Sequence, residues 1–475
     1  MHYGELITTM PVTQRIRCFH LPRFEVEGGP EPLRYGEVEV EVPPLSPAQL
    51  RRAIAQAREV SATRLRRRTV SELMESIDRI VSNWLRLDYP LRERAEAVLP
   101  AVTGFSPEMI HHGLPLLLEP LRGAAVRSLL DAELGDHRVL DAISNGRCAL
   151  GPGLITHVLS GNIPGLAAAP MLLSLALKAP VLVKSAAGDP VFPALLASSI
   201  AEVDPDLGDC VLVTYWRGGA AEIEEVALSS AEVVVASGSD AAMAALAPRV
   251  PGRFIGHGHK ISFATIGREC LADLDNIGRL ARALAYDVSL WDQQGCLSPQ
   301  LCYIEDGGRF GLAAFAEQLG AGLAAYATEL PPRRLDLSER AQVLRFRQQA
   351  EWSAGVPGMP RLLASSNSTD WSISIETSAD FLPTCLNRCV RLKVIGDLSE
   401  LPAVIEPHRR HLEAVGLAVE AGRLGTLSAM LAHSGLHRVC PLGKMQRPPL
   451  SWRQGGRPRV ADWVRWTGVE EGLGA

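Results

Sequence analysis

The sequence predicts an α/β protein that contains a doubly wound parallel sheet. Short apolar segments of β type recur after gaps of helix length, at 155–159, 181–183, 211–213 and 233–235. Strands that are apolar throughout and separated by crossover helices are typical of a parallel sheet covered on both faces, and right-handed crossovers make it doubly wound. After about Gly256 the pattern changes, which indicates a second α/β segment.

The individual elements are expected in the following places. An alternating Glu-Val run at 37–42 predicts an edge strand, and the pattern from Ser46 to about Ala132 is helical. Within this helical region, Thr69-x-x-Glu72 has the spacing of a capping box. The crossover helices are expected at 164–177, 192–201 and 220–228. The second segment is expected to contain strands at 261–264, 301–304 and 371–376, helices at 271–285 and 309–325, and a loop at 291–300.

Composition excludes several classes of protein. The chain has 475 residues, 47% of them hydrophobic and 21% charged, which is globular composition and suggests two or three domains. A net charge of −5 disfavours nucleic-acid binding. The apolar stretch at 154–183 is interrupted by prolines, a histidine and a lysine, so we expect no membrane span. No signal peptide is evident.

Cysteine usage points to a reducing compartment. The nine cysteines are spread irregularly, and no pair has the C-x-x-C spacing of a zinc or redox motif. We therefore expect reduced thiols in a cytoplasmic enzyme. His257 and His259 have no third ligand at a familiar spacing, so we expect no metal site. The sequence also lacks a G-x-S-x-G elbow and a G-x-G-x-x-G run after any predicted strand.

Cys296 is the first candidate for chemistry. It lies in a polar turn between a helix and a strand, whereas a structural cysteine usually lies on an apolar face. The residues alone leave two interpretations open, an ordinary loop thiol and a nucleophile. Cys302, inside the apolar run at 301–304, is expected in the core.

Further candidates follow the predicted strands, since ligands of such sheets bind beyond the C-terminal strand ends. Asn162 follows the first strand, either as a turn or cap residue or as an amide donor to an oxyanion. Lys184, followed by Ser185, ends the next strand, either as a surface lysine or as a contact to a nucleotide. The turn formed by Ser237, Gly238 and Ser239 is a candidate phosphate cradle, a weak signal alone.

These residues together resemble a known family. The stretch 292–300, Asp-Gln-Gln-Gly-Cys-Leu-Ser-Pro-Gln, is similar to the catalytic cysteine loop of acyl-CoA reductases, the family typified by the fatty-acid reductase subunit of bacterial bioluminescence. That family lies in the aldehyde dehydrogenase superfamily. The resemblance spans roughly residue 46 to the C-terminus. Supporting segments are Gly161-Asn162-Ile163-Pro164, Val183-Lys184-Ser185, 237–240, 258–262 and 441–446.

The resemblance implies an aldehyde-dehydrogenase-like fold and a role for each candidate. Cys296 would be the nucleophile, with Asn162 and the Cys296 N–H as the oxyanion hole. Lys184 and Ser185 would contact the adenosine ribose or its 2′-phosphate, and the turn at 237–239 would approach the pyrophosphate. The expected domains are an N-terminal extension (1–45), a nucleotide-binding domain with a helical lead-in (46–256), a catalytic domain (257–435) and a C-terminal tail that returns to the cofactor domain (436–475).

Two departures from the superfamily pattern refine this expectation. Gly256 stands where hydrolytic aldehyde dehydrogenases carry a glutamate base, so water is poorly activated to attack an acyl-enzyme. The Glu-x-Phe-Gly-Pro motif that steadies the nicotinamide ribose is also missing. The first departure points away from acid production, and the second leaves the residue that steadies that ribose unassigned.

The expected function is NAD(P)H-dependent reduction of an acyl thioester to an aldehyde through an acyl-cysteine. NADPH is the expected cofactor, with NADH as the alternative. Electropositive groups, namely the nicotinamide ring and helix dipoles, are expected to favour the Cys296 thiolate. The substrate is an acyl-CoA or acyl-carrier thioester, an acyl-transferring or acyl-activating protein is a candidate partner, and a homo-oligomer is expected. Two alternatives stay open: a CoA-acylating aldehyde dehydrogenase running oxidatively, and a catalytically idle scaffold for an acyltransferase partner.

Overall fold

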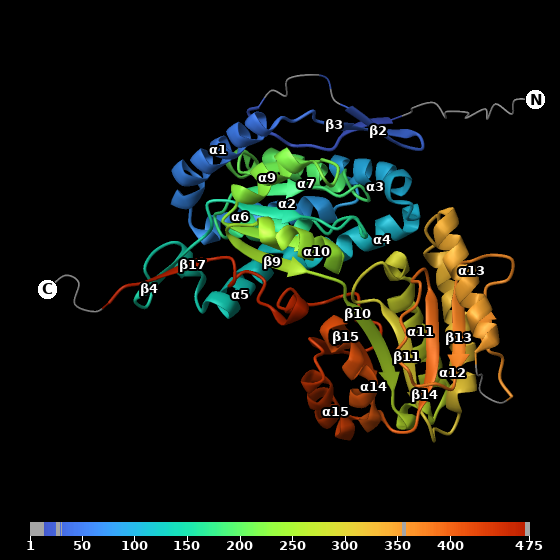
Figure 1. Ribbon diagram of the computed structural model, residues 1–475. Helices are drawn as coiled ribbons and strands as arrows, with labels where there is room; N and C mark the ends of the chain where they lie inside the picture. Colours follow the sequence, from blue (N-terminus) through green and yellow to red (C-terminus); the bar gives the residue numbers. More distant parts are fainter. Residues whose placement is uncertain (1–13, 25–28, 30, 354–357, 471–475) are drawn as a thin grey trace, which may run out of the picture. The chain divides into compact units, whose positions relative to one another are not determined.

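The chain forms two compact units. The computed structural model describes residues 14–24, 29, 31–353 and 358–470. Unit 1 contains the described residues up to 110, residues 117–256 and those from 463 on, and unit 2 contains residues 111–116 and 257–462 (Figure 1). The C-terminal tail is thus shared, because residues 436–462 belong to unit 2 and the chain enters unit 1 again at residue 463.

The central sheet of unit 1 has the strand order β7-β6-β5-β8-β9. The pairs β5/β6, β6/β7 and β5/β8 are parallel. The strands are β5 (Ile155–Val158), β6 (Val181–Lys184), β7 (Val211–Thr214), β8 (Val233–Ser237) and β9 (Arg253–His257). The chain runs outward from β5 in both directions, which makes β5/β8 the topological switch point of a doubly wound sheet. The predicted strands and sheet type are confirmed.

Helices cover both faces of this sheet. Side chains of α1 and α9 pack with sheet residues such as Leu182, Leu212 and Val234 in one core cluster. The α-helices between residues 47 and 246 are α1 (Pro47–Thr63), α2 (Val70–Leu85), α3 (Pro90–Thr103), α4 (Pro107–Leu118), α5 (Gly123–Leu134), α6 (Ala168–Ala176), α7 (Phe192–Val203), α8 (Pro205–Gly208), α9 (Ala221–Ser229) and α10 (Asp240–Leu246). All belong to unit 1 except for residues 111–116 of α4. The Thr69/Glu72 capping box begins α2 and fixes the start of its buried apolar stripe.

The N-terminal strands correct one prediction. A small sheet has the order β1-β3-β2, formed by β1 (Gln14–Arg17), β2 (Glu31–Tyr35) and β3 (Val38–Val42). The strand predicted at 37–42 as an edge strand is therefore the middle strand, and that prediction is wrong. Alternation of apolar and polar residues indicates that one face of a strand is buried, but it does not show whether both edges of the strand are paired. A separate antiparallel pair joins β4 (Arg147–Leu150) to β17 (Arg465–Gly468).

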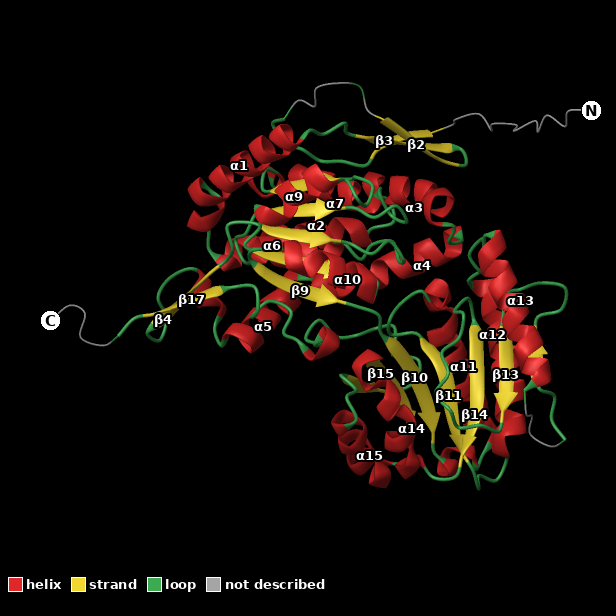
Figure 2. Ribbon diagram, in the orientation of Figure 1, coloured by secondary structure: helices red, strands yellow, loops and turns green. Residues whose placement is uncertain are grey.

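Unit 2 is built on a seven-stranded sheet of order β12-β13-β14-β11-β10-β15-β16 (Figure 2). Every pair is parallel except β12/β13. The strands are β10 (Ile261–Ile266), β11 (Pro299–Glu305), β12 (Leu362–Ala364), β13 (Ser372–Glu376), β14 (Cys389–Ile395), β15 (Leu412–Ala418) and β16 (Arg438–Cys440). The three strands predicted for this segment correspond to β10, β11 and β13.

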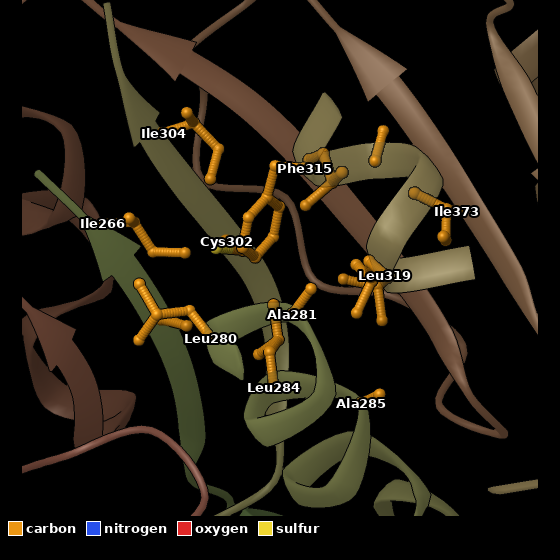
Figure 3. Packing of buried hydrophobic residues seen from close by; sticks show 14 of the residues in the cluster. Ile266, Leu280, Ala281, Leu284, Ala285, Cys302, Ile304, Phe315, Leu319 and Ile373 are labelled. Atoms are coloured by element: carbon orange, nitrogen blue, oxygen red, sulfur yellow. The ribbon is translucent and has the colours of Figure 1, made fainter. Parts of the chain in front are cut away.

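Alternate residues of these strands face two different cores. Cys302 and Ile304 of β11 pack with helices α11 (Leu274–Ser289) and α12 (Gly311–Glu329) (Figure 3). Cys302 is fully buried there, so its prediction as a core residue is confirmed. Leu301 and Tyr303 point to the opposite face, where α14 (Leu401–Ile405) and α15 (Ala421–His433) pack. The remaining helix, α13 (Leu337–Trp352), packs beside β13. No helix in the described ranges is both long enough and apolar enough to cross a membrane.

Candidate active site

Cys296 lies in the turn between α11 and β11. The Ser262 hydroxyl donates to the Cys296 carbonyl oxygen (2.6 Å) and accepts from the Ala414 N–H (3.1 Å). This single side chain therefore connects the cysteine backbone to two neighbouring strands, β10 and β15. The half-buried Cys296 side chain packs against a cluster formed by Leu297, Ala414, Cys440, Met445 and Trp452.

The backbone before Cys296 is strained. Trp291, Asp292 and Gln293 have φ values of 57°, 49° and 62°, in the left-handed region that non-glycine residues rarely adopt. The Trp291 ring fills the space above Gly113, where an added Cβ would lie 2.1 Å from ring atom Cζ2. The Gln293 amide donates to the carbonyl oxygens of Pro299 (2.8 Å) and Cys389 (3.0 Å). These contacts hold the turn in a conformation that its own residues disfavour.

A second left-handed segment supports the first. Leu386, Asn387 and Arg388 have φ values of 63°, 54° and 58°. The Asn387 N–H donates to the Asp292 carbonyl oxygen (3.2 Å), and the Arg388 Nε donates to Asp292 Oδ1 (2.5 Å). Asp292 Oδ2 accepts from the Arg333 N–H (2.8 Å). Both Asp292 and Arg388 are buried, so the cysteine turn rests on an ion pair removed from water.

We expect Arg388→Met to destabilise the protein by roughly 3–5 kcal/mol, because it leaves the buried Asp292 carboxylate without its cation. Chemical denaturation followed by circular dichroism measures this loss in the free energy of unfolding. Arg345→Met, which removes an exposed arginine of α13, is the matched control. An equal, small change in both variants would contradict the structural role of the ion pair.

The tail motif at 441–446 is attached to the cysteine turn through Asp287. The Asp287 carboxylate accepts from the N–H groups of Gly443 (2.6 Å) and Met445 (3.1 Å). The Gln446 amide donates to the Asp287 carbonyl oxygen (3.1 Å) and to the Ser298 hydroxyl. Burial raises the pKa of Asp287 to about 7. Sequence reasoning singled out the tail motif but missed Asp287, which carries no motif of its own.

The surroundings of Cys296 shift the pKa of its thiol. Burial, with the Glu413 carboxylate as a second cause, raises the pKa of the Cys296 thiol to about 12, although Lys260 and Arg459 act in the opposite direction. Lys260 and Arg459 thus act in the expected direction, but desolvation outweighs them. Among the protein's own groups, the balance therefore favours the thiol form of Cys296.

In unit 1, the Asn162 turn is fixed by close backbone packing. An added Cβ at Gly161 would lie 2.8 Å from the backbone of Gly188, so the loops after β5 and β6 are in direct contact. The buried Asp189 accepts from the N–H groups of Gly165 (3.3 Å) and Phe192 (3.0 Å) and thereby joins the Asn162 turn to α7. Burial raises the pKa of Asp189 to about 6. Sequence reasoning missed Asp189, which carries no motif of its own.

The other candidates of unit 1 lie at the same edge of its sheet, because β5, β6 and β8 are adjacent and parallel. Lys184 ends β6, with its Nζ 5.9 Å from the centre of the Tyr215 ring, and burial lowers its pKa. Ser185 is fully buried, and its hydroxyl has no hydrogen-bond partner among the described residues. Ser237 ends β8 and Gly238 follows it, whereas the Ser239 hydroxyl caps α10 by accepting from the Ala242 N–H (3.2 Å). Asn162, Lys184, Ser185 and the turn at 237–239 thus gather at one edge, and Cys296 belongs to unit 2.

Known proteins resemble this chain in sequence. A family model described as "Acyl-CoA reductase (LuxC)" matches residues 65–465. The chain belongs to the acyl-CoA reductase family. It is 22% identical over 389 residues to long-chain acyl-protein thioester reductase 2 of Photobacterium leiognathi, covering 79% of this chain and 77% of that protein. It is 25% identical to the corresponding reductase of Vibrio harveyi, over 69% of this chain and 68% of that protein.

Solved structures confirm the aldehyde-dehydrogenase-like fold of this acyl-CoA reductase family member. Aldehyde dehydrogenase C of Pseudomonas syringae, determined with NAD+ and octanal, superposes with a TM-score of 0.70 at 14% identity, covering 95% of this chain and 96% of that one. An oxidoreductase from Marinobacter aquaeolei gives a TM-score of 0.69 at 14% identity and covers 99% of both chains. At such identity the likeness concerns the fold alone.

Proposed function

We propose that this chain reduces an acyl thioester to an aldehyde through an acyl group carried on Cys296. The observation that carries the proposal is the cysteine turn: a half-buried thiol held by two strained segments and a buried ion pair, in a member of the acyl-CoA reductase family. Strain of this kind is common at sites where a reacting group has to be held in place.

The thiol sulfur attacks the carbonyl carbon of the thioester, the bond to the carrier sulfur breaks, and the carrier leaves as a thiol. We propose that the Asn162 amide and the Cys296 N–H donate hydrogen bonds to the oxygen that becomes negatively charged. The Asn162 role rests on the family resemblance and is supported by the Asp189 contacts that hold its turn. A bound reduced nicotinamide dinucleotide would supply the hydride that converts the acyl group to an aldehyde.

The edge of the unit 1 sheet fits such a dinucleotide. The buried Ser185 hydroxyl lacks a partner among the described residues, and the partly buried Lys184 has a lowered pKa, so a ribose hydroxyl or phosphate would satisfy both groups. Ser237 and Gly238 lie at the end of β8, where a pyrophosphate would be held. Ser239 would contribute its backbone, since its hydroxyl already caps α10. We propose NADPH as the cofactor, because the Lys184 cation suits a 2′-phosphate, with NADH as the alternative.

An assay of aldehyde formation tests the function. Purified protein is given acyl-CoA or acyl-carrier-protein thioesters of short to long chain, with NADPH or NADH, and aldehyde is measured together with nucleotide oxidation. The proposal expects one aldehyde for each nucleotide oxidised with at least one thioester. Thioester cleavage without aldehyde would contradict it, and the same assay run from aldehyde, CoA and NADP+ shows which direction is faster.

Gly256→Glu should redirect part of the acyl-enzyme to free acid, because it restores a carboxylate base at the position where hydrolytic relatives carry one. A Cβ at this position would lie 2.8 Å from Phe254 Cε1 and 3.1 Å from Met243 Sδ, both ends of side chains that can shift. We expect acid release from a labelled thioester to rise by at least about tenfold, a modest share of what general bases contribute. Gly256→Gln has the same size without the base, and equal acid release in both variants would contradict the argument.

We further propose that the enzyme works in the cytoplasm as a homo-oligomer and receives acyl groups from an acyl-transferring or acyl-activating partner. All nine cysteines lie in described residues and are free thiols, which fits a reducing compartment. The oligomer and the partner rest on the family resemblance alone. Light scattering of the purified protein measures the oligomeric state, and a monomer at micromolar concentration would contradict this part of the proposal.

A further inference from the structure

A buried carboxylate and a histidine lie at the same sheet edge as Cys296. Strands β11, β10, β15 and β16 are adjacent and parallel, so their first residues meet at one edge of the unit 2 sheet. Cys296 lies just before β11, Glu413 is the second residue of β15, and His437 directly precedes β16. Ser262, near the start of β10, joins the Cys296 carbonyl oxygen to the N–H of Ala414, the residue after Glu413.

The Glu413 side chain is enclosed but incompletely satisfied. It is fully buried, and its Oε1 accepts from the Gly455 N–H (3.0 Å). Its Oε2 accepts no hydrogen bond from the described residues and lies 3.5 Å from Nδ1 of His437, which has no hydrogen-bond partner there either. A buried carboxylate oxygen that accepts no hydrogen bond costs free energy. Oε2 thus keeps a lone pair that can accept a hydrogen bond.

The surrounding loop is shaped to hold this pair. Gly455 and Gly456 have φ values of 60° and 76°, which favour glycine. A Cβ at Gly456 would lie 2.9 Å from Cδ2 of the His437 ring, so only glycine leaves room for the imidazole. The His437 side chain is 24% exposed, whereas that of Glu413 is 0% exposed. His437 is therefore the route by which a proton could pass between Glu413 and the solvent.

The charge of Glu413 affects the pKa of the Cys296 thiol. Glu413 is the largest contributor, after burial, to the raised pKa of the Cys296 thiol. The other charged groups that act on this thiol are Lys260, whose ammonium donates to the carbonyl oxygens of Arg410 (3.0 Å) and Leu412 (3.4 Å), and Arg459, which donates to the Trp452 carbonyl oxygen (3.0 Å). Burial lowers the pKa of His257 to about 4, although the Glu413 charge acts in the opposite direction.

We propose that Glu413 is the general base for Cys296, with His437 as the positioning residue that connects it to solvent. This inference rests on the proposed function. As the sulfur–carbon bond forms, Glu413 takes the thiol proton, directly or through one water molecule. As the bond to the carrier sulfur breaks, Glu413 returns that proton to the leaving sulfur, so acylation consumes no proton overall. When the aldehyde later leaves, the Cys296 thiolate takes up a proton from solvent through His437 and Glu413.

The variant Glu413→Gln separates a base from a mere neighbouring charge. If Glu413 only repels the thiolate, its neutralisation lowers the pKa of Cys296 and speeds both iodoacetamide alkylation and acylation. If Glu413 is the base, alkylation still shifts to lower pH, but acylation from an acyl-CoA at neutral pH falls by about a hundredfold or more. Acylation by the variant should then rise steadily with pH as the thiolate forms without help.

The measurements are rapid-quench acylation, read by mass spectrometry, and the pH profile of alkylation, with the exposed Glu406→Gln as control. Acylation by Glu413→Gln that equals or exceeds that of the wild type overturns the proposal. A wild-type protein that takes up no acyl group would instead overturn the proposed function. Should Glu413→Gln not fold, His437→Gln carries the test: it should slow turnover by about tenfold while the exposed His433→Gln does not, and equal turnover in both overturns the proposal.

Discussion

Cys296→Ala should abolish aldehyde formation, a larger loss than any other single substitution produces, because it removes the sulfur that carries the acyl group in the proposed reaction. The Cys296 sulfur is the attacking atom, and alanine offers no nucleophile in its place. The measurement is aldehyde formed per enzyme under the same conditions as for the wild type. The variant should keep its fold, since the turn is held by Asp292, Gln293 and Ser262 rather than by the thiol.

A matched control comes from the same unit. Cys270 is also a half-buried thiol with a pKa raised by burial, but it packs against the α11 core cluster instead of the cysteine turn. Cys270→Ala should retain aldehyde formation. Wild-type turnover by Cys296→Ala, or equal losses in both variants, would refute the assignment of the nucleophile.

Asn162→Ala should lower the rate of acylation by about a hundredfold, the usual loss when one oxyanion donor is removed. The effect should fall on acylation and not on folding, because the turn around Asn162 is held by Asp189 and by the Gly161/Gly188 contact. Rapid-quench measurement of acyl-enzyme formation, together with thermal unfolding, distinguishes the two. Asn83→Ala on α2 is the control, and an unchanged acylation rate in Asn162→Ala would remove Asn162 from the site.

Much of the fold was predictable because its signals are local. The unit 1 strands are uniformly apolar and spaced by helix-length segments, a pattern that requires no knowledge of distant contacts. Cys296 could be picked out as a candidate for the same reason, since a thiol in a polar turn contrasts with the buried Cys302 in the strand that follows.

The parts that sequence reasoning missed depend on long-range order. Glu413 and His437 reach the Cys296 edge only because β15 and β16 lie beyond β10 in the sheet, and neither strand was predicted. The left-handed segments at 291–293 and 386–388 contain no glycine and are stabilised by each other across the fold. The raised pKa of the Cys296 thiol was not foreseen, because the sequence does not reveal burial at a polar turn and this burial outweighs the nearby cations.

Peptide mapping of the acylated protein tests the central claim most directly. Wild-type protein is incubated with an acyl-CoA in the absence of nicotinamide nucleotide, digested and analysed by mass spectrometry. We predict one acyl mass per chain, on the peptide that contains Cys296, and its release as aldehyde when NADPH is added. An acyl group on another residue, or none at all, would contradict the account.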